Sequence, residues 1–254
     1  MDITVPYKIG IKLWSNNYQW FPEAVKRFQN KEFDFIELYV VPKSFHETHW
    51  NILKQANIPI NIHAPNEHQL NLATSNEQNI FILEEVRRAA DFFSSEYIII
   101  HPGVGEDIQC IISNIRHTND PRLIIENTPK KSLIGNDSLF GYTFERMKIL
   151  LEETKRNFCL DFTHAIKSAT SQNIDAQEFI GKLMALHPAV FHISDGDSTI
   201  EHDQHFNLGE GNFNLKFNKS CVLQCPNAFV VLETPKTNNT LENDIKNIKF
   251  FKDL

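Results

Sequence analysis

Residue types that bind metal ions recur at the ends of short apolar runs along this chain. His63 ends the run IPINIH, His101 ends YIIIH and Glu126 ends RLIIE. A polar or charged side chain at the tip of a buried strand is costly unless another group pairs with it. Because such tips end six successive runs, the sequence predicts one shared metal centre. The predicted ligands are His63, His101, Glu126, Asp161, His164, His192, Asp203, His205 and Glu233.

The strands and helices that must position these side chains alternate along the sequence. Continuous runs of Val, Ile and Phe are typical of strands buried on both faces, as in parallel sheets. They predict strands over residues 7–14, 33–41, 58–64, 97–103, 122–127, 157–162, 189–195 and 228–234. Amphipathic stretches between the strands predict helices over residues 21–30, 45–56, 76–93, 105–117, 140–155, 175–186, 214–224 and 240–252.

Eight predicted strands and eight predicted helices in 254 residues indicate an α/β fold, a (β/α)8 TIM barrel that forms a single domain over residues 1–254. The main alternative is a doubly wound sheet, which usually carries a Gly-rich phosphate-binding turn after its first strand. No such turn follows residues 7–14, and the GEG of residues 209–211 comes only after the seventh predicted strand. We therefore favour the barrel, in which the carboxyl ends of all strands meet at one mouth.

Neighbouring strands of such a barrel would group the predicted ligands into three sets. Glu126 lies between the first two sets and would bridge two ions through its two oxygens. Nitrogen and oxygen ligands of this mix suit Zn²⁺ or Mn²⁺, so we expect up to three zinc ions, with manganese as the alternative. The sets are His63, His101 and Glu126; Glu126, Asp161, His192 and Glu233; and His164, Asp203 and His205.

Two kinds of reaction fit these ligands. Several metal ions favour hydrolysis of a phosphate ester, because they lower the pKa of a water molecule and neutralise charge on the phosphate. In that reaction Glu126 would bridge and position the ions, and Glu233 would hold the attacking water. A single ion in the second set would instead bind a sugar, and the same two glutamates would move protons in an isomerase or epimerase. A metal-binding protein without catalysis is a third hypothesis.

The bulk composition narrows the class of protein. A net charge of −7 provides no overall basic field, which counts modestly against nucleic acid as a substrate. The amino-terminal sequence MDITVPYKIG lacks the basic and apolar pattern of a signal peptide. No run approaches the roughly 18 apolar residues of a membrane helix. Four cysteines are too few for a disulfide framework at this length, so we expect a cytoplasmic protein.

Further residues near the predicted strand ends have two interpretations each. Lys12 either contacts a phosphate or carboxylate in the barrel mouth or extends into water. Trp14 and Trp20 either line the substrate pocket or pack in the interior. Asp195 either orients a ligand or only turns the chain. His164 is either a ligand or a residue that orients a ligand carboxylate.

Six short motifs resemble a known family. They are HPG at 101–103, IEN at 125–127, CLD..HA at 159–165, H..D at 192–195, D.H..LGEG at 203–211 and LET at 232–234. On these motifs, residues 58–235 resemble the xylose isomerase-like barrel superfamily and, within it, endonuclease IV, the zinc-dependent apurinic endonuclease. The resemblance implies the three ligand sets given above, zinc as the metal, and DNA with abasic sites as the substrate.

Several segments depart from the endonuclease IV pattern. Lys12 stands where that family has the His of a Gly-x-His-x-Ser motif. The segment ELYVVPKSFHE replaces a basic loop, Asn66 and His68 stand near the position of an aromatic residue, and GDST replaces a segment with Lys. Glu37 is similar to a strand acid of the sugar isomerase and epimerase branch. Because the departures concern DNA contacts, a different phosphate ester or a sugar remains an alternative substrate.

Overall fold

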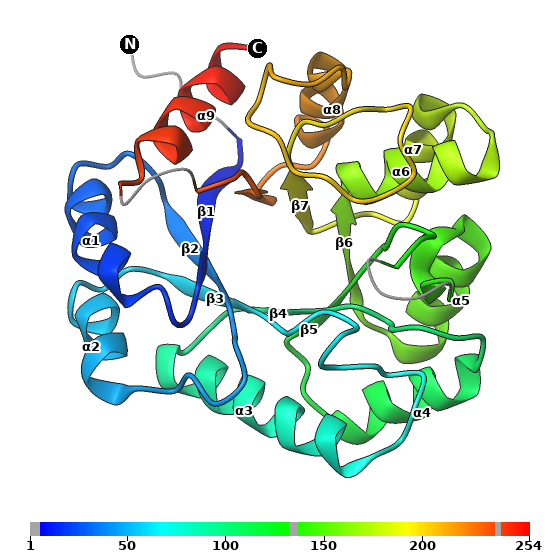
Figure 1. The fold of residues 1–254 in the computed structure, drawn as a ribbon, viewed down its shortest axis with the longest axis horizontal. Helices are drawn as coiled ribbons and strands as arrows, with labels where there is room; N and C mark the ends of the chain where they lie inside the picture. Colours follow the sequence, from blue (N-terminus) through cyan, green and yellow to red (C-terminus); the bar gives the residue numbers. More distant parts are fainter. Residues whose placement is uncertain (1–5, 133–136, 237–239) are drawn as a thin grey trace.

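The computed structural model describes residues 6–132, 137–236 and 240–254. Within these residues, eight parallel strands pair in chain order and β8 pairs with β1, which closes a barrel (Figure 1). The predicted (β/α)8 fold is therefore confirmed, although the strands are shorter than expected. The strands are β1 Lys8–Trp14, β2 Phe35–Tyr39, β3 Ile60–His63, β4 Ile98–Ile100, β5 Leu123–Glu126, β6 Asn157–Asp161, β7 Val190–Ile193 and β8 Phe229–Leu232.

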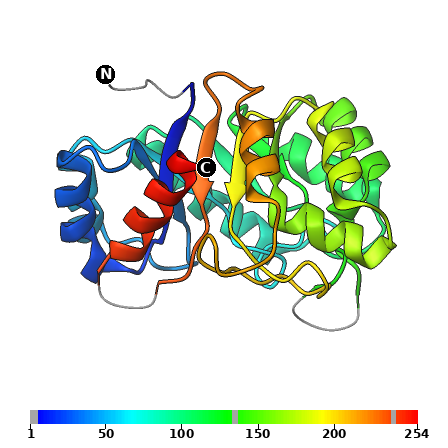
Figure 2. The ribbon, with the colours of Figure 1, turned by 90° about the horizontal axis from the view of Figure 1, so that it is seen from above.

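Helices surround the outside of the barrel, and the segment between β7 and the helix after it lies at one end (Figure 2). Short 3-10 helices cover Tyr18–Trp20 and Phe140–Tyr142. None of the helices in the described ranges is long and apolar enough to cross a membrane. The α-helices are α1 Phe21–Gln29, α2 Glu47–Gln55, α3 Glu77–Phe93, α4 Ile108–Thr118, α5 Phe144–Thr154, α6 Phe162–Gln172, α7 Ala176–Met184, α8 Leu215–Val222 and α9 Glu242–Asp253.

Helix α6 is absent from the sequence-based prediction, which placed no helix between the sixth strand and residues 175–186. It begins directly after β6, where the side chain of Asp161 accepts a hydrogen bond from the His164 backbone N–H (2.6 Å) and caps the helix. Every residue from Phe162 to Ala169 is buried, because α6 contacts both β7 and α7. The buried positions of α6 include polar residues such as Thr163, Lys167 and Ser168, so the pattern of apolar residues does not show how much of this helix is buried.

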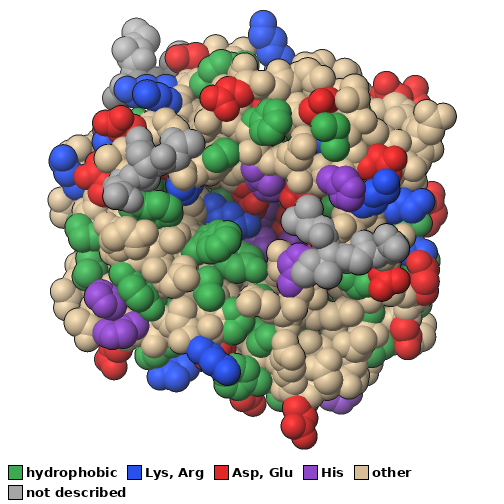
Figure 3. Space-filling model, in the orientation of Figure 1, with side chains coloured by type: hydrophobic (Ala, Val, Ile, Leu, Met, Phe, Trp, Pro, Cys, Tyr) green, Lys and Arg blue, Asp and Glu red, His purple; other side chains and the backbone are tan. Residues whose placement is uncertain are grey.

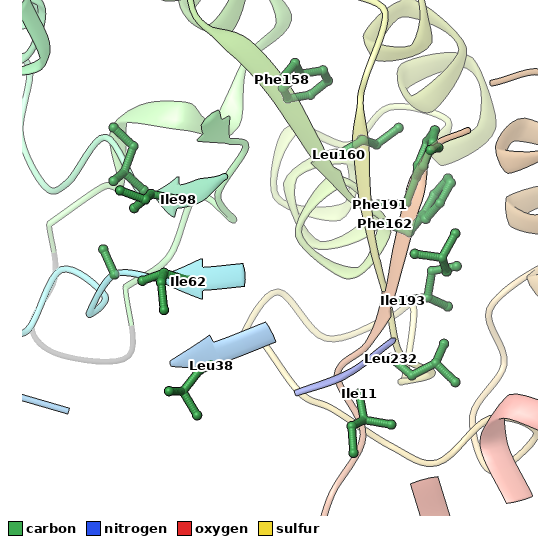
Figure 4. Close-up of a cluster of buried hydrophobic side chains, with 14 of the residues drawn as sticks. Ile11, Leu38, Ile62, Ile98, Phe158, Leu160, Phe162, Phe191, Ile193 and Leu232 are labelled. Atoms are coloured by element: carbon green, nitrogen blue, oxygen red, sulfur yellow. The ribbon is translucent and has the colours of Figure 1, made fainter. Parts of the chain in front are cut away.

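Side chains along each strand alternate between the surrounding helices and the inside of the barrel. Outward-facing residues such as Ile62, Ile98 and Leu232 belong to the large core between strands and helices (Figure 4). A separate cluster fills the bottom of the barrel. Its fully or almost fully buried members are Phe35, Tyr97, Ile99, Ile124, Cys159, Val190 and Val231.

The bottom layer is closely packed against β1. A Cβ atom on Gly10 would lie 2.7 Å from the ring of Phe35, so glycine leaves the space that this ring occupies. Two residues further along each strand, the side chain points inward again, one layer nearer the mouth. Ile124 is thus followed by Glu126, and Val190 by His192. The strand period therefore places a polar layer directly above an apolar floor.

Candidate metal centre

The structure brings all nine predicted ligands to the same end of the barrel. They surround or lie beneath a pocket of about 460 Å³. Figure 3 shows a hollow in the middle of this face, with acidic, basic and histidine side chains gathered inside it. Glu126, Asp161 and His192 are almost completely buried, whereas Glu233 is partly accessible from the pocket. Such a concentration of buried charge requires cations or protons to balance it.

The potential ligand atoms form the three sets that strand order predicts. Within each set, one nitrogen or oxygen atom from every residue lies within 4.8 Å of the others. A fourth such set replaces Glu126 and Asp161 with residues of β2 and β3. The sets are His63, His101 and Glu126; Glu126, Asp161, His192 and Glu233; His164, Asp203 and His205; and Glu37, His63, His192 and Glu233; a fifth comprises Glu126, Cys159 and His192.

Glu126 occupies the centre of this arrangement. Its Oε2 atom lies 3.1 Å from Nε2 of His63 and 3.1 Å from Nε2 of His101. Its Oε1 atom lies 3.1 Å from Nδ1 of His192 and 3.2 Å from Nδ1 of His164. Because the two oxygens face different histidines, the carboxylate has the geometry expected of a group shared by two ions.

Backbone carbonyls hold three of the histidines, among them His63 and His164. Nδ1 of His63 lies 2.6 Å from the carbonyl oxygen of Ala64, and Nδ1 of His164 lies 2.9 Å from that of Asn127. An N–H that donates to such a carbonyl leaves the other ring nitrogen, Nε2, to face the cluster. Metal-binding histidines are oriented in this way, since the outer hydrogen bond selects the tautomer.

The third set contains a carboxylate, that of Asp203, with one oxygen that has no hydrogen-bond partner within the ranges that the structure describes. Nε2 of His205 lies 2.9 Å from Oδ2 of Asp203, and Nε2 of His164 lies 3.6 Å from the same oxygen. Nδ1 of His205 donates to the carbonyl oxygen of Glu233 (2.8 Å). The other oxygen of Asp203 is buried and has no hydrogen-bond partner among the described residues. A buried carboxylate oxygen in this position fits a cation, because leaving it without any partner is costly.

Asp195 anchors the loop that carries Asp203 and His205. Its carboxylate accepts hydrogen bonds from four backbone N–H groups at 2.9–3.1 Å. The donors are Gly196, Gly209, Gly211 and Phe213. The GEG segment is therefore folded onto a carboxylate, so Asp195 organises this loop, a role that neither of the two interpretations describes.

Two comparisons with known proteins bear on this arrangement. Residues 25–254 match the sequence profile of the family described as xylose isomerase-like TIM barrel. The chain belongs to this family. The resemblance predicted from the motifs is thereby confirmed at the level of the superfamily. No curated protein matches the sequence.

Solved structures similar to this xylose isomerase-like barrel include both branches of the superfamily. Endonuclease IV from Thermus thermophilus has a TM-score of 0.72 and 20% identity, covering 97% of this chain and 98% of that one. A D-tagatose 3-epimerase-like protein has a TM-score of 0.70 and 20% identity, covering 97% and 96%. The IOLI protein with a bound zinc atom has a TM-score of 0.67 and 15% identity, covering 96% of each chain. At these identities the likeness establishes the fold alone.

The electrostatics of this xylose isomerase-like barrel favour cations in the pocket. Burial by itself lowers the pKa of a histidine, but Glu126 and Glu67 raise the pKa of His101 to about 9. Asp203 likewise outweighs burial and raises the pKa of His205 to about 9. Protons on His101 and His205 thus help to balance the carboxylates in the metal-free protein. Divalent cations would displace these protons on binding.

Residues of β1 and β2 complete the site, although the sequence analysis gave them no definite place in it. Lys12 points into the pocket, where it forms ion pairs with Glu233 and with Glu37 (3.6 Å), so it does not extend into water. Trp14 and Trp20 line the same pocket. The signal that identifies Glu37 is the strand period, because it lies two residues after a residue of the apolar floor.

Proposed function

We propose that this protein is a metal-dependent hydrolase of phosphate esters that binds up to three zinc or manganese ions. The main support for this proposal is the third set of potential ligands, which contains none of the residues of the second set. An isomerase with one ion needs only the four residues of the second set, whereas His164, Asp203 and His205 offer a further set. Bound divalent cations would supply an activated water molecule and neutralise the charge on a phosphoryl group.

The chain's own residues would divide the remaining tasks. Glu126 would hold two ions at a fixed separation, because its two oxygens face different histidines. Glu233 would orient the attacking water, since it lies at the accessible edge of the cluster. Although burial raises the pKa of Glu233, Lys12 and His192 lower it well below its ordinary value, so this carboxylate stays ionised and able to accept a hydrogen bond.

DNA with an abasic site is the substrate that we favour within this class. Support comes from the motifs shared with endonuclease IV and from the structural similarity to the Thermus thermophilus enzyme. The departures in the DNA-contacting segments make another phosphate ester the alternative within the same reaction. We also infer that the chain acts as one cytoplasmic domain, which is consistent with its four free cysteines.

A sugar isomerase or epimerase with one metal ion is the second candidate. It is supported by the complete second set of potential ligands, by similar epimerase structures and by Glu37 in the strand β2. In that reaction Glu126 and Glu233 would move protons between adjacent carbons of a sugar held by the ion. The two candidates therefore share residues but differ in the number of ions.

Metal content separates the two candidates. Protein purified without chelators and loaded with zinc or manganese should contain about three ions per chain by elemental analysis, as the three sets predict. A value near one would favour the isomerase. Nicking of a duplex with one abasic site, compared with an intact duplex, then tests the substrate. Cleavage of a generic phosphodiester without nicking would reject only DNA, and epimerisation of a ketose without either activity would reject the hydrolase.

A further inference from the structure

Glu37 is a buried carboxylate that belongs to none of the three predicted ligand sets. It lies on β2 with no exposed surface, two residues after Phe35 of the apolar floor. An ionised group in this position is tolerated only where charged or hydrogen-bonding partners surround it. The role of Glu37 must therefore be found in its contacts.

Three donors converge on this carboxylate. Nε2 of His192 lies 3.1 Å from both of its oxygens, and the Tyr97 hydroxyl donates to Oε2 (3.0 Å). Nζ of Lys12 lies 3.6 Å from Oε1. Glu37 is thus surrounded by donors and contacts Nε2 of His192, the ring nitrogen on the side away from the cluster.

The other ring nitrogen of His192 faces the predicted metal ligands. Nδ1 lies 2.8 Å from Glu233, 3.1 Å from Glu126 and 3.9 Å from Asp161. A neutral imidazole carries one N–H. If Nε2–H donates to Glu37, Nδ1 points at three carboxylates, which is favourable only when Nδ1 carries a proton or a metal ion lies between them.

We propose that Glu37 is a positioning residue that keeps His192 in the tautomer whose Nδ1 binds the ion of the second set. This inference depends on the metal centre of the proposed function but not on its substrate. A carboxylate that accepts from the outer N–H of a ligand histidine fixes the ring and increases its basicity. Lys12 supports the arrangement because its ammonium group stabilises the charge of Glu37 and also pairs with Glu233.

His192 differs in this respect from the histidines held by the backbone. Nδ1 of His63, His164 and His205 each contacts a carbonyl oxygen, which a side-chain substitution does not remove. His192 depends on a side chain from another strand. A change at Glu37 therefore alters one predicted ligand without replacing any residue of the three sets.

Glu37→Gln is the direct test. All three neighbours of Glu37 are donors, so the amide NH₂ of glutamine would face a donor, or would donate to Nε2 of His192 and select the wrong tautomer. We expect a roughly 10–100-fold weaker affinity for one zinc ion, with the other ions bound as in the wild type. Zinc titration by calorimetry with a competing chelator measures this loss.

Asp120→Asn is the matched control. Asp120 is also buried and ion-paired, to Arg122, but it precedes β5 at the opposite end of the barrel. This variant should lose stability while it retains wild-type zinc affinity. A folded Glu37→Gln protein with every zinc affinity unchanged would overturn the inference and leave the proposed function intact. A wild-type protein that binds no divalent cation would overturn both.

A second measurement needs no variant. In zinc-loaded wild-type protein with ¹⁵N-labelled histidine, NMR should show His192 bound through Nδ1 and a slowly exchanging Nε2–H, as expected for a donor buried against Glu37. Binding of zinc through Nε2 of His192 would contradict the inference, whether or not Glu37→Gln folds.

Discussion

Lys12 forms an ion pair with Glu233 inside the barrel, where β1 lies beside β8. The same ammonium group lies 3.6 Å from Glu37. One lysine therefore balances two carboxylates in the metal-free protein, the buried Glu37 and the partly accessible Glu233, which belongs to the predicted metal centre.

Replacing Lys12 with Met should destabilise the metal-free protein more than the zinc-loaded protein. Without zinc, Glu37 and Glu233 lose their shared partner, and the free energy of unfolding should fall by about 3–5 kcal/mol. Zinc beside Glu233 would compensate for part of this loss. Urea unfolding with and without zinc measures the difference, and equal losses in both conditions would argue against an ion next to Glu233.

Replacing Glu126 with Gln should remove two ions rather than one. The two oxygens of Glu126 face different sets, and an amide binds zinc much more weakly than a carboxylate does. Elemental analysis after gel filtration gives the number of ions directly. Loss of a single ion would contradict the bridging role.

Replacing Asp203 with Ala should affect only the third set. Its carboxylate contacts His164 and His205 but does not contact the residues of the first set in the structure. We expect one zinc ion to bind about 10–100-fold more weakly, by analogy with other changes around metal ligands. A chelator competition assay should then show two ions with unchanged affinity.

In the metal-free protein, the free energy of unfolding should decrease as the pH rises from 6.5 to about 9. The pKa values of His101 and His205 are raised from 6.5 to about 9, although burial opposes this, because carboxylates surround both rings. A histidine whose pKa is higher in the folded state than in the unfolded state stabilises the folded protein. This stabilisation is complete when the pH is below the unfolded-state pKa, and it is lost as the pH rises through the folded-state pKa.

Urea titrations in chelator at several pH values between these limits measure the effect. The zinc-loaded protein is the control, because metal ions replace the protons and should remove most of the decrease. Stability of the metal-free protein that increases with pH over this interval would contradict the prediction.

Gly211→Ala should disturb the loop that carries the third set. A Cβ atom there would lie 2.3 Å from the carbonyl oxygen of Gly196 and 2.4 Å from Oδ1 of Asp195, so the loop must move. We expect a loss of about 1–3 kcal/mol in stability and weaker binding of one zinc ion. Gly181→Ala in α7 is the matched control, because the added Cβ would meet no atom within 4 Å beyond its neighbours and the backbone of its own helix. It should be neutral or slightly stabilising, and a similar effect on zinc binding in both variants would contradict the loop's role.

Much of the fold and of the candidate site was predictable because both depend on local patterns. Strands buried on two faces produce continuous apolar runs, and a ligand must interrupt such a run where the strand reaches the mouth. Residues such as His101 and Glu126 are therefore visible in the sequence as polar tips. The motifs around Asp161 and Asp203 added the loop residues through their resemblance to a family.

Other features depend on contacts that no local pattern records. Helix α6 was missed because its neighbours bury polar residues such as Thr163, Lys167 and Ser168, which the sequence alone does not mark as buried. The role of Asp195 became visible only when its carboxylate was found among four backbone N–H groups. In both cases the partner residues, rather than the segment itself, determine what the segment does.

The sequence by itself determined the barrel, its order of strands and the residues that reach its mouth. Burial and the two-residue period of a strand both appear as patterns among neighbouring residues, which the sequence shows directly. The tertiary structure alone decided which of these residues meet. Glu37 and His192 are 155 positions apart, and they lie in contact only because both point into the barrel that the sheet forms on closing. Their separation along the chain leaves no short-range signal, because the contact depends on closure of all the strands.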